Sequence, residues 1–353
     1  MQVFSASQAI SPAIERTRSY LFRPFRWSTY LKLCTVAVLT EGFGGNFNFS
    51  SPGNSSHGSG IPSQTPFHIT SFEIALIVIA VAVCIALGIY ILYLITRLRF
   101  AFFHCLIHQT KEIRPGWRLY REHAMRFFEL NLVIGLVFLC VVVVLAVPFV
   151  LAFIHLFKSS GPGSHFNILG FVSLLLPLIL IVLALVLVGV AVDIILRDFM
   201  LPHVALENAT ARAAWSAVRA RIAAEKGAFL FYAFLRVVIP VAAMMCLILI
   251  LIIPMIILVL IVVAIVAGLH ALLAGSSGAS AFFLIPLAAI FVLACICFAV
   301  LLGISLGGPV STWVRNYSLL FYGGRFPLLG DILVPPPPPP PAPLDASDAP
   351  QPA

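Results

Sequence analysis

Residues 237–269 read VVIPVAAMMCLILILIIPMIILVLIVVAIVAGL, and Cys246 is the only ionisable side chain in this run. A helix needs about 20 apolar residues to cross the hydrocarbon core of a bilayer. No water is available there, so every backbone N–H and C=O must be paired within the segment, as happens in a helix. A transmembrane strand would alternate polar and apolar residues, and Leu247 to Leu260 do not alternate. The run therefore predicts an all-α membrane protein.

The composition of the whole chain points the same way. Of its 353 residues 61% are hydrophobic and 10% are charged, whereas a globular domain carries roughly 25% charged residues. The formal net charge is +8, and the basic residues flank the apolar blocks. The expected partner is therefore the lipid bilayer with its anionic headgroups, and no nucleic acid is expected. The seven cysteines lie within or at the ends of apolar stretches, which is typical of small buried side chains.

We expect a polytopic transmembrane helical bundle of six spans. The fifth apolar block extends well beyond residue 262, and a turn near Pro254 would make seven spans instead. The first block is short and carries Lys32, so it either spans obliquely or lies half-inserted in the interface. The helical membrane domain is predicted over 1–330, and a proline-rich disordered tail over 331–353. The six predicted spans lie near 27–43, 71–95, 130–157, 168–195, 228–262 and 281–306.

The distribution of basic residues predicts the orientation of the bundle. Under the six-span model, one side of the membrane holds 18 of the 21 Lys and Arg residues. The opposite side holds only Lys158. Because basic loops stay in the cytoplasm, we expect a multi-pass protein of the cell (inner) membrane with both termini cytoplasmic. Four tryptophans are expected to anchor the chain at the cytoplasmic interface: Trp27, Trp117, Trp215 and Trp313.

A threefold repeat follows from this topology. Each predicted unit has a short basic amphipathic segment, a span outward and a span back. The third segment, 208–226, places apolar residues at helical spacing. The other two segments lie near 10–21 and 117–127. Each is expected to be an interfacial helix that either lies in the headgroup plane or packs on the base of the bundle. The apolar stripe of the third segment consists of Ala211, Trp215, Val218 and Ile222.

Charged residues at the cytoplasmic ends of the spans form the candidate site. Asp193 and Arg197 are one helical turn apart and can pair. Charges inside a membrane protein usually face partners, so we expect these residues to form one network. A network that fixes the packing of the helices is favoured over a gate or a relay, because transport sites tend to lie at the midplane. The candidate intramembrane charge network comprises Asp193, Arg197, Asp198, Arg236 and Arg315.

No catalytic signature is present, and no catalytic residue is expected. The chain has no Walker loop, GxSxG, HExxH or dinucleotide fingerprint. His104 and His108 have the spacing of two metal ligands, with His123 as the nearest third candidate. Interfacial histidines without a metal are much commoner, so neither a metal nor a cofactor is expected. We predict that the protein is not an enzyme.

Five stretches of the chain carry a family resemblance: RPFRWSTYLKLCTVAVLTEGFGGNFNF (23–49), WRLYREHAMRFF (117–128), RDFMLPHVAL (197–206), AFLFYAFLRVVIPV (228–241) and WVRNYSLLFYGGRFP (313–327). They resemble an uncharacterised family of bacterial multi-pass membrane proteins, which is loosely similar to the membrane domain of some glycerophosphodiester phosphodiesterases. The resemblance implies a helical membrane bundle with no assigned reaction. It implies no phosphodiesterase activity, because no soluble metal-binding barrel accompanies the membrane part.

These features favour a non-enzymatic membrane scaffold or accessory protein, whose protein partner the sequence leaves open. The alternative is a transporter or lipid-handling permease that uses the charged cluster near the cytoplasmic face. A membrane-embedded enzyme would rest on the three histidines alone.

Overall fold

A computed structural model describes residues 4–42, 71–159, 168–274 and 278–334. All regular elements in these ranges are helices, which confirms the predicted all-α fold. The long helices are α3 (Ser71–His108), α5 (Arg121–Ser159), α6 (Ile168–Ile194), α9 (Lys226–Ala274) and α10 (Gly278–Gly323). The short ones are α1 (Ile10–Phe22), α2 (Trp27–Gly42), α4 (Arg114–Leu119), the π-helix η1 (Ile195–Met200), α7 (Leu201–Leu206), α8 (Ala211–Ala224) and α11 (Pro327–Leu333). The glycine-rich segment 44–70 and the prolines 335–341 lie outside the described residues.

Five helices in the described ranges are long and apolar enough to cross a membrane. They contain the second to sixth predicted spans, and the chain is therefore membrane-embedded. α9 is continuous for 49 residues with Pro240 and Pro254 inside it. The turn near Pro254 that a seven-span chain requires is thus absent from α9. The five candidate spans are Ile74–His108, Arg121–Leu156, Phe171–Leu206, Lys226–Gly268 and Ala289–Gly323.

The first predicted span, 27–43, differs from the other five. Its described residues form the 16-residue helix α2, roughly 24 Å long, and residue 43 lies outside the described ranges. Near one end of α2, the Tyr30 hydroxyl donates a hydrogen bond to the carbonyl of Ser305 at 2.7 Å. Two turns further along α2, a methyl group added at Gly307, in the same α10 turn, would lie 3.5 Å from Val38. The described part of α2 therefore packs against α10, and the span predicted over 27–43 stays a prediction.

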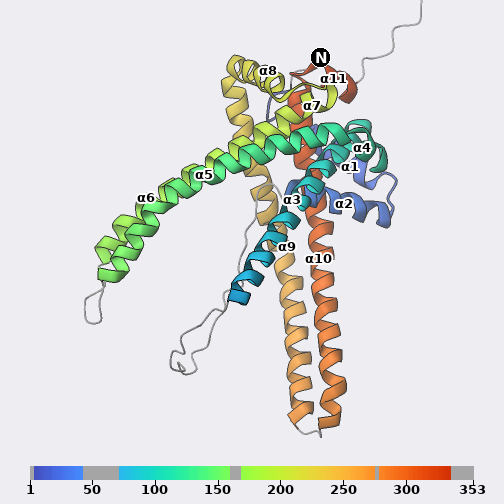
Figure 1. The fold of residues 1–353 in the computed structure, drawn as a ribbon. Coiled ribbons are helices and arrows are strands. Elements are labelled where there is room, and N and C mark those ends of the chain that lie inside the picture. Colours follow the sequence, from blue (N-terminus) through green and yellow to red (C-terminus); the bar gives the residue numbers. More distant parts are fainter. Residues whose placement is uncertain (1–3, 43–70, 160–167, 275–277, 335–353) are drawn as a thin grey trace, which may run out of the picture.

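The short helices gather at one end of the molecule (Figure 1). We call this end the cap: α1, α2, α4, α7, α8 and α11 with the adjoining ends of the long helices. From the cap the α5–α6 and α9–α10 hairpins diverge in Figure 1. The buried core lies in the cap, where Phe100, Phe127, Tyr232, Tyr317 and Phe321 are fully covered. By contrast, the most apolar window of each candidate span has no buried residue. Apolar surface of this extent needs a lipid environment.

The packing of the cap follows the predicted repeat. α4 packs on α3, α8 packs on η1, and α1 packs on α10. α4 and α8 thus each contact the helix that returns to the cap in the preceding unit. α1, which begins the first unit, contacts the returning helix of the last unit. The second basic segment differs from the expectation of one separate interfacial helix. It breaks at Tyr120, and its remainder is the first part of α5, because the buried stripe of Ala124 and Phe127 continues directly into the apolar span.

Candidate functional site

The predicted charged residues meet where the cap joins the long helices, with Asp198 at the centre. Its carboxylate is 3.0 Å from Nε of Arg236 and 3.0 Å from Nη1 of Arg315. The Tyr232 hydroxyl donates to the same carboxylate at 2.8 Å. The side chain of Asp198 is only 1% exposed. One carboxylate on η1 therefore ties α9 and α10 together.

A second centre forms around Arg197, the neighbour of Asp198. Its guanidinium pairs with Asp193 at 2.9 Å and with Glu41 at 3.2 Å. Glu41 lies at the end of α2 and also pairs with Arg236 at 2.9 Å. Glu41 thereby connects the two centres. We refer to Glu41, Asp193, Arg197, Asp198, Arg236 and Arg315 as the charge network, in which each side chain makes at least one ion pair.

The π-helix η1 explains how two adjacent residues both face buried partners. Arg197 and Asp198 are 4% and 2% exposed, and Leu196, Phe199 and Met200 are also buried. Single π-helical turns within longer α-helices are rare and occur frequently at functional sites. Here the turn is covered by α7, α8 and α10, so side chains around its circumference have partners.

Three residues of this region were not predicted. Glu41 stands alone at the end of an apolar block, next to the glycine-rich segment, and nothing in the sequence pairs it with an arginine. Tyr232 lies one helical turn before Arg236 and could have been found by that spacing. Arg99 of α3 donates to the carbonyl of Thr40 at 3.2 Å, and Arg197 donates to the same carbonyl. The three helices that return to the cap each bring one arginine to this region, namely Arg99, Arg197 and Arg315.

The charged side chains of this region are paired, and little space is left between them. Four guanidinium groups, that of Arg99 included, face three carboxylates, which leaves one positive charge in excess. The space between Thr40, Glu41, Arg99, Arg197 and Arg315 is too small for a water molecule. Buried ion pairs of this kind are costly to break, because removal of one partner leaves an uncompensated charge. The arrangement is suited to holding α2, η1, α9 and α10 in register.

A second polar cluster surrounds His203 of α7, within the cap. Its Nδ1 is 2.7 Å from Oε2 of Glu207, and its Nε2 is 2.8 Å from the Tyr322 hydroxyl. Arg221 of α8 lies 2.6 Å from the same Nε2 and stacks over the ring of Phe326. The cluster joins α7, α8 and the end of α10. Only the i, i+4 spacing of His203 and Glu207 could have suggested it from the sequence.

The histidines considered as metal ligands have other surroundings. The His104 and His108 rings lie 4.5 Å apart, and both His104 and His123 pack near Tyr120. Within the described ranges, no three His, Cys, Asp or Glu side chains come together as a metal site would require.

The four tryptophans all belong to the cap end of the molecule. Trp27 and Trp215 are exposed. Trp117 is held by Arg97, whose guanidinium lies 4.3 Å from the ring centroid, a cation–π contact. Trp313 is partly buried against the core, and its indole N–H has no partner among the described residues. Trp27 and Trp215 are thus accessible and their role as interfacial anchors stays a prediction, whereas Trp313 packs inside the cap.

Comparison with known proteins places the chain in a family without assigning a reaction. No curated protein and no solved structure matches the chain. No comparison supports similarity to the membrane domain of glycerophosphodiester phosphodiesterases, so that similarity stays a prediction. The family that matches is a family of unknown function, DUF7544, over residues 4–332. This match spans all the described helices except the last residue of α11, and the chain therefore belongs to the family DUF7544.

Proposed function

We propose that this protein is a non-enzymatic integral membrane scaffold or accessory protein, whose cap presents a fixed surface at the cytoplasmic face of a bacterial inner membrane. The charge network is the observation that carries this proposal. Its six side chains pair with one another across α2, α6, η1, α9 and α10. The space beside them does not admit a water molecule. A relay or a substrate path needs groups that exchange partners or face an aqueous cavity.

The position of the network also supports a structural role. Transport sites tend to lie near the bilayer midplane, between discontinuous helices. Asp198 and Arg236 instead lie at the ends of their helices that join the cap, where short amphipathic helices cover them. A rigid junction at this position fixes how the cap is held relative to the spans.

The orientation in this proposal rests on charge. The basic segments of the sequence converge on the cap, together with Trp27, Trp117 and Trp215. Because basic segments are retained in the cytoplasm, the cap and both termini are proposed to face the cytoplasm. Anionic lipid headgroups are the proposed small partners, and the exposed part of the cap is the proposed surface for a protein partner.

A transporter or lipid-handling permease is the second candidate. It is favoured by the one excess positive charge beside Arg99 and by the prolines inside the spans, because proline interrupts helical hydrogen bonding. Those prolines are Pro148, Pro177, Pro240, Pro254, Pro286 and Pro309.

The two candidates differ in flux across a vesicle membrane. The purified full chain is reconstituted into vesicles of phosphatidylcholine and phosphatidylglycerol, and proton flux is followed with a trapped pH-sensitive dye. Movement of a fluorescent phospholipid between leaflets is measured in parallel. The scaffold proposal predicts rates equal to those of vesicles without protein. A saturable rate that Arg236→Gln abolishes, while the variant stays folded, would establish the second candidate instead.

A further inference from the structure

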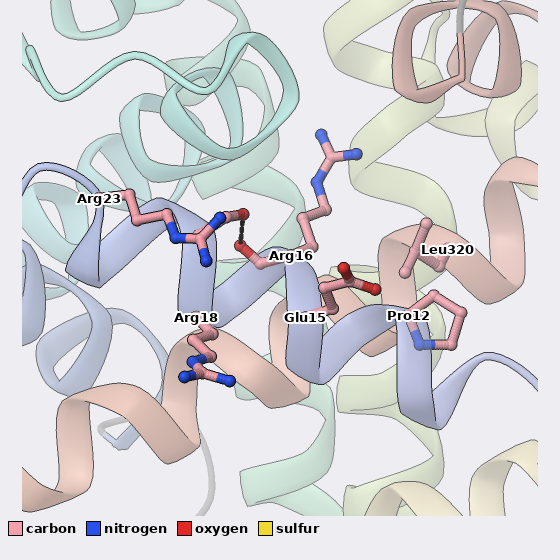
Figure 2. A pocket seen from close by; sticks show the side chains of 7 residues that line it. Pro12, Glu15, Arg16, Arg18, Arg23 and Leu320 are labelled. Atoms are coloured by element: carbon pink, nitrogen blue, oxygen red, sulfur yellow. Dashed lines mark hydrogen bonds between the residues drawn. The ribbon is translucent and has the colours of Figure 1, made fainter.

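The outer face of α1 carries a basic groove that the charge network does not use. The groove measures about 410 Å³ and is lined from α1, from the residue that follows α1 and from α10. Figure 2 shows its side chains: Arg16 and Arg18 point away from each other, and Arg23 lies toward the end of α1. The lining contains three arginines and one carboxylate, so the groove is cationic. Its lining residues are Pro12, Glu15, Arg16, Arg18, Ser19, Arg23 and Leu320.

The arginines of the groove differ in their partners. Arg16 is held by the fold, because its guanidinium donates to the carbonyls of Leu106 at 3.0 Å and Leu333 at 3.3 Å. Burial lowers the pKa of this guanidinium. Arg18 and Arg23 are exposed, and neither makes an ion pair with a described residue. The groove thus has one fixed wall and two arginines available to an external anion.

An exposed aromatic cluster lies next to Arg23 in the sequence, at the corner between α1 and α2. Phe22 and Phe25 are each 44% exposed and Trp27 is 66% exposed, and the Phe25 and Trp27 rings pack edge to face at 5.2 Å. The Lys111 ammonium donates to the carbonyl of Arg23 at 3.1 Å, which fixes the corner between α1 and α2. Aromatic rings beside arginines are typical of the membrane interface, where the rings enter the headgroup layer.

We propose that the α1 groove and the adjoining aromatic corner bind an anionic phospholipid, with Arg18 and Arg23 on the headgroup phosphate and the rings of Phe25 and Trp27 against the acyl boundary. Arginine suits phosphate because its planar guanidinium can donate two hydrogen bonds to one phosphate group. A soluble phosphate compound would satisfy the arginines but would leave the aromatic corner in water. The contiguity of charge and aromatic surface therefore favours a lipid. This site rests on the proposed function in one respect: the cap must lie at the headgroup level.

The test measures lipid binding to the purified full chain in detergent by native mass spectrometry. Dioleoylphosphatidylglycerol is titrated against dioleoylphosphatidylcholine, and glycerol 1-phosphate serves as the soluble competitor. The double variant Arg18→Gln/Arg23→Gln is compared with Arg212→Gln/Arg219→Gln, which removes the same charge from the exposed face of α8. Basic residues near anionic lipid contribute roughly fivefold in affinity each, so loss of two predicts an affinity about thirtyfold weaker.

The proposal requires that phosphatidylglycerol bind more tightly than phosphatidylcholine, and that only the α1 variant lose this preference. The variant Arg18→Lys/Arg23→Lys, which keeps the charge, should retain most of the preference. Equal loss in the α1 and α8 variants would overturn the proposal, because overall charge would then explain binding. Displacement of the lipid by glycerol 1-phosphate at similar concentration would overturn it in favour of a soluble ligand. Flux across vesicles tests the proposed function separately, so failure of one proposal is distinguishable from failure of the other.

Discussion

The substitution Asp198→Asn removes the charge on which Arg236 and Arg315 converge. Both guanidinium groups lie 3.0 Å from the Asp198 carboxylate, whose side chain is 1% exposed. Breaking one partner of a buried ion pair costs about 3–5 kcal/mol, because the remaining charges stay buried without compensation. The Asn side chain keeps a single carbonyl oxygen, whereas the carboxylate accepts from two arginines and from Tyr232. We therefore expect a loss of about 3–5 kcal/mol in the free energy of unfolding.

Asp193→Asn provides the matched control for this prediction. Asp193 makes one ion pair, with Arg197 at 2.9 Å, and its side chain is 32% exposed. A pair of that exposure contributes at most about 1 kcal/mol. The assay is thermal unfolding of both purified variants in the same detergent, followed by the fraction that remains monodisperse after heating. At roughly 2–4 °C per kcal/mol, Asp198→Asn should unfold about 6 °C or more below wild type and Asp193→Asn within a few degrees. Equal midpoints for the two variants would refute the reasoning.

Two further predictions concern helix contacts in the cap. Gly308→Ala places a methyl group against the backbone and side chain of Cys34, so α2 must shift, at a cost of about 1–3 kcal/mol. Gly303→Ala on the same helix is the control, because its added methyl group meets nothing within 4 Å. Thermal unfolding should show this variant to be as stable as wild type or more stable. Similar losses of stability in the two glycine variants would show that α2 does not approach α10 closely. Tyr322→Phe removes the hydroxyl that is 2.8 Å from Nε2 of His203 and should cost about 1–3 kcal/mol in unfolding by denaturant, because a buried polar group loses a partner. An unchanged unfolding midpoint for Tyr322→Phe would contradict the contact.

The positions of the long helices could be predicted from composition, because only apolar residues tolerate hydrocarbon over about 20 positions. The span predicted at 27–43 stays a prediction: the block has the composition of a span, and its described part is a 16-residue helix that packs on α10. The close approach of α2 to α10 at Gly308 could not be predicted, because a pairwise contact of residues 274 positions apart leaves no periodic signal in the sequence.

The charged residues of the candidate site could be predicted, but their pairing could not. Asp193, Arg197, Asp198, Arg236 and Arg315 are visible as charges at the ends of apolar blocks. The partner of each arginine depends on tertiary packing, and Glu41 was missed for that reason. An isolated carboxylate beside a glycine-rich segment has the pattern of a solvated helix end. Its role as the bridge between Arg197 and Arg236 follows only from the placement of α2.

A double-mutant cycle on Asp198 and Arg236 tests most directly whether the charge network acts as one structural unit. The free energies of unfolding of Asp198→Asn, Arg236→Gln and the double variant are compared with wild type. Groups in one buried network couple by about 0.5–3 kcal/mol, whereas independent sites add within about 0.5 kcal/mol. Our account predicts that the double variant is more stable than the sum of the two single losses implies, by at least about 1 kcal/mol. Additive losses would contradict the claim that these two residues hold the bundle together.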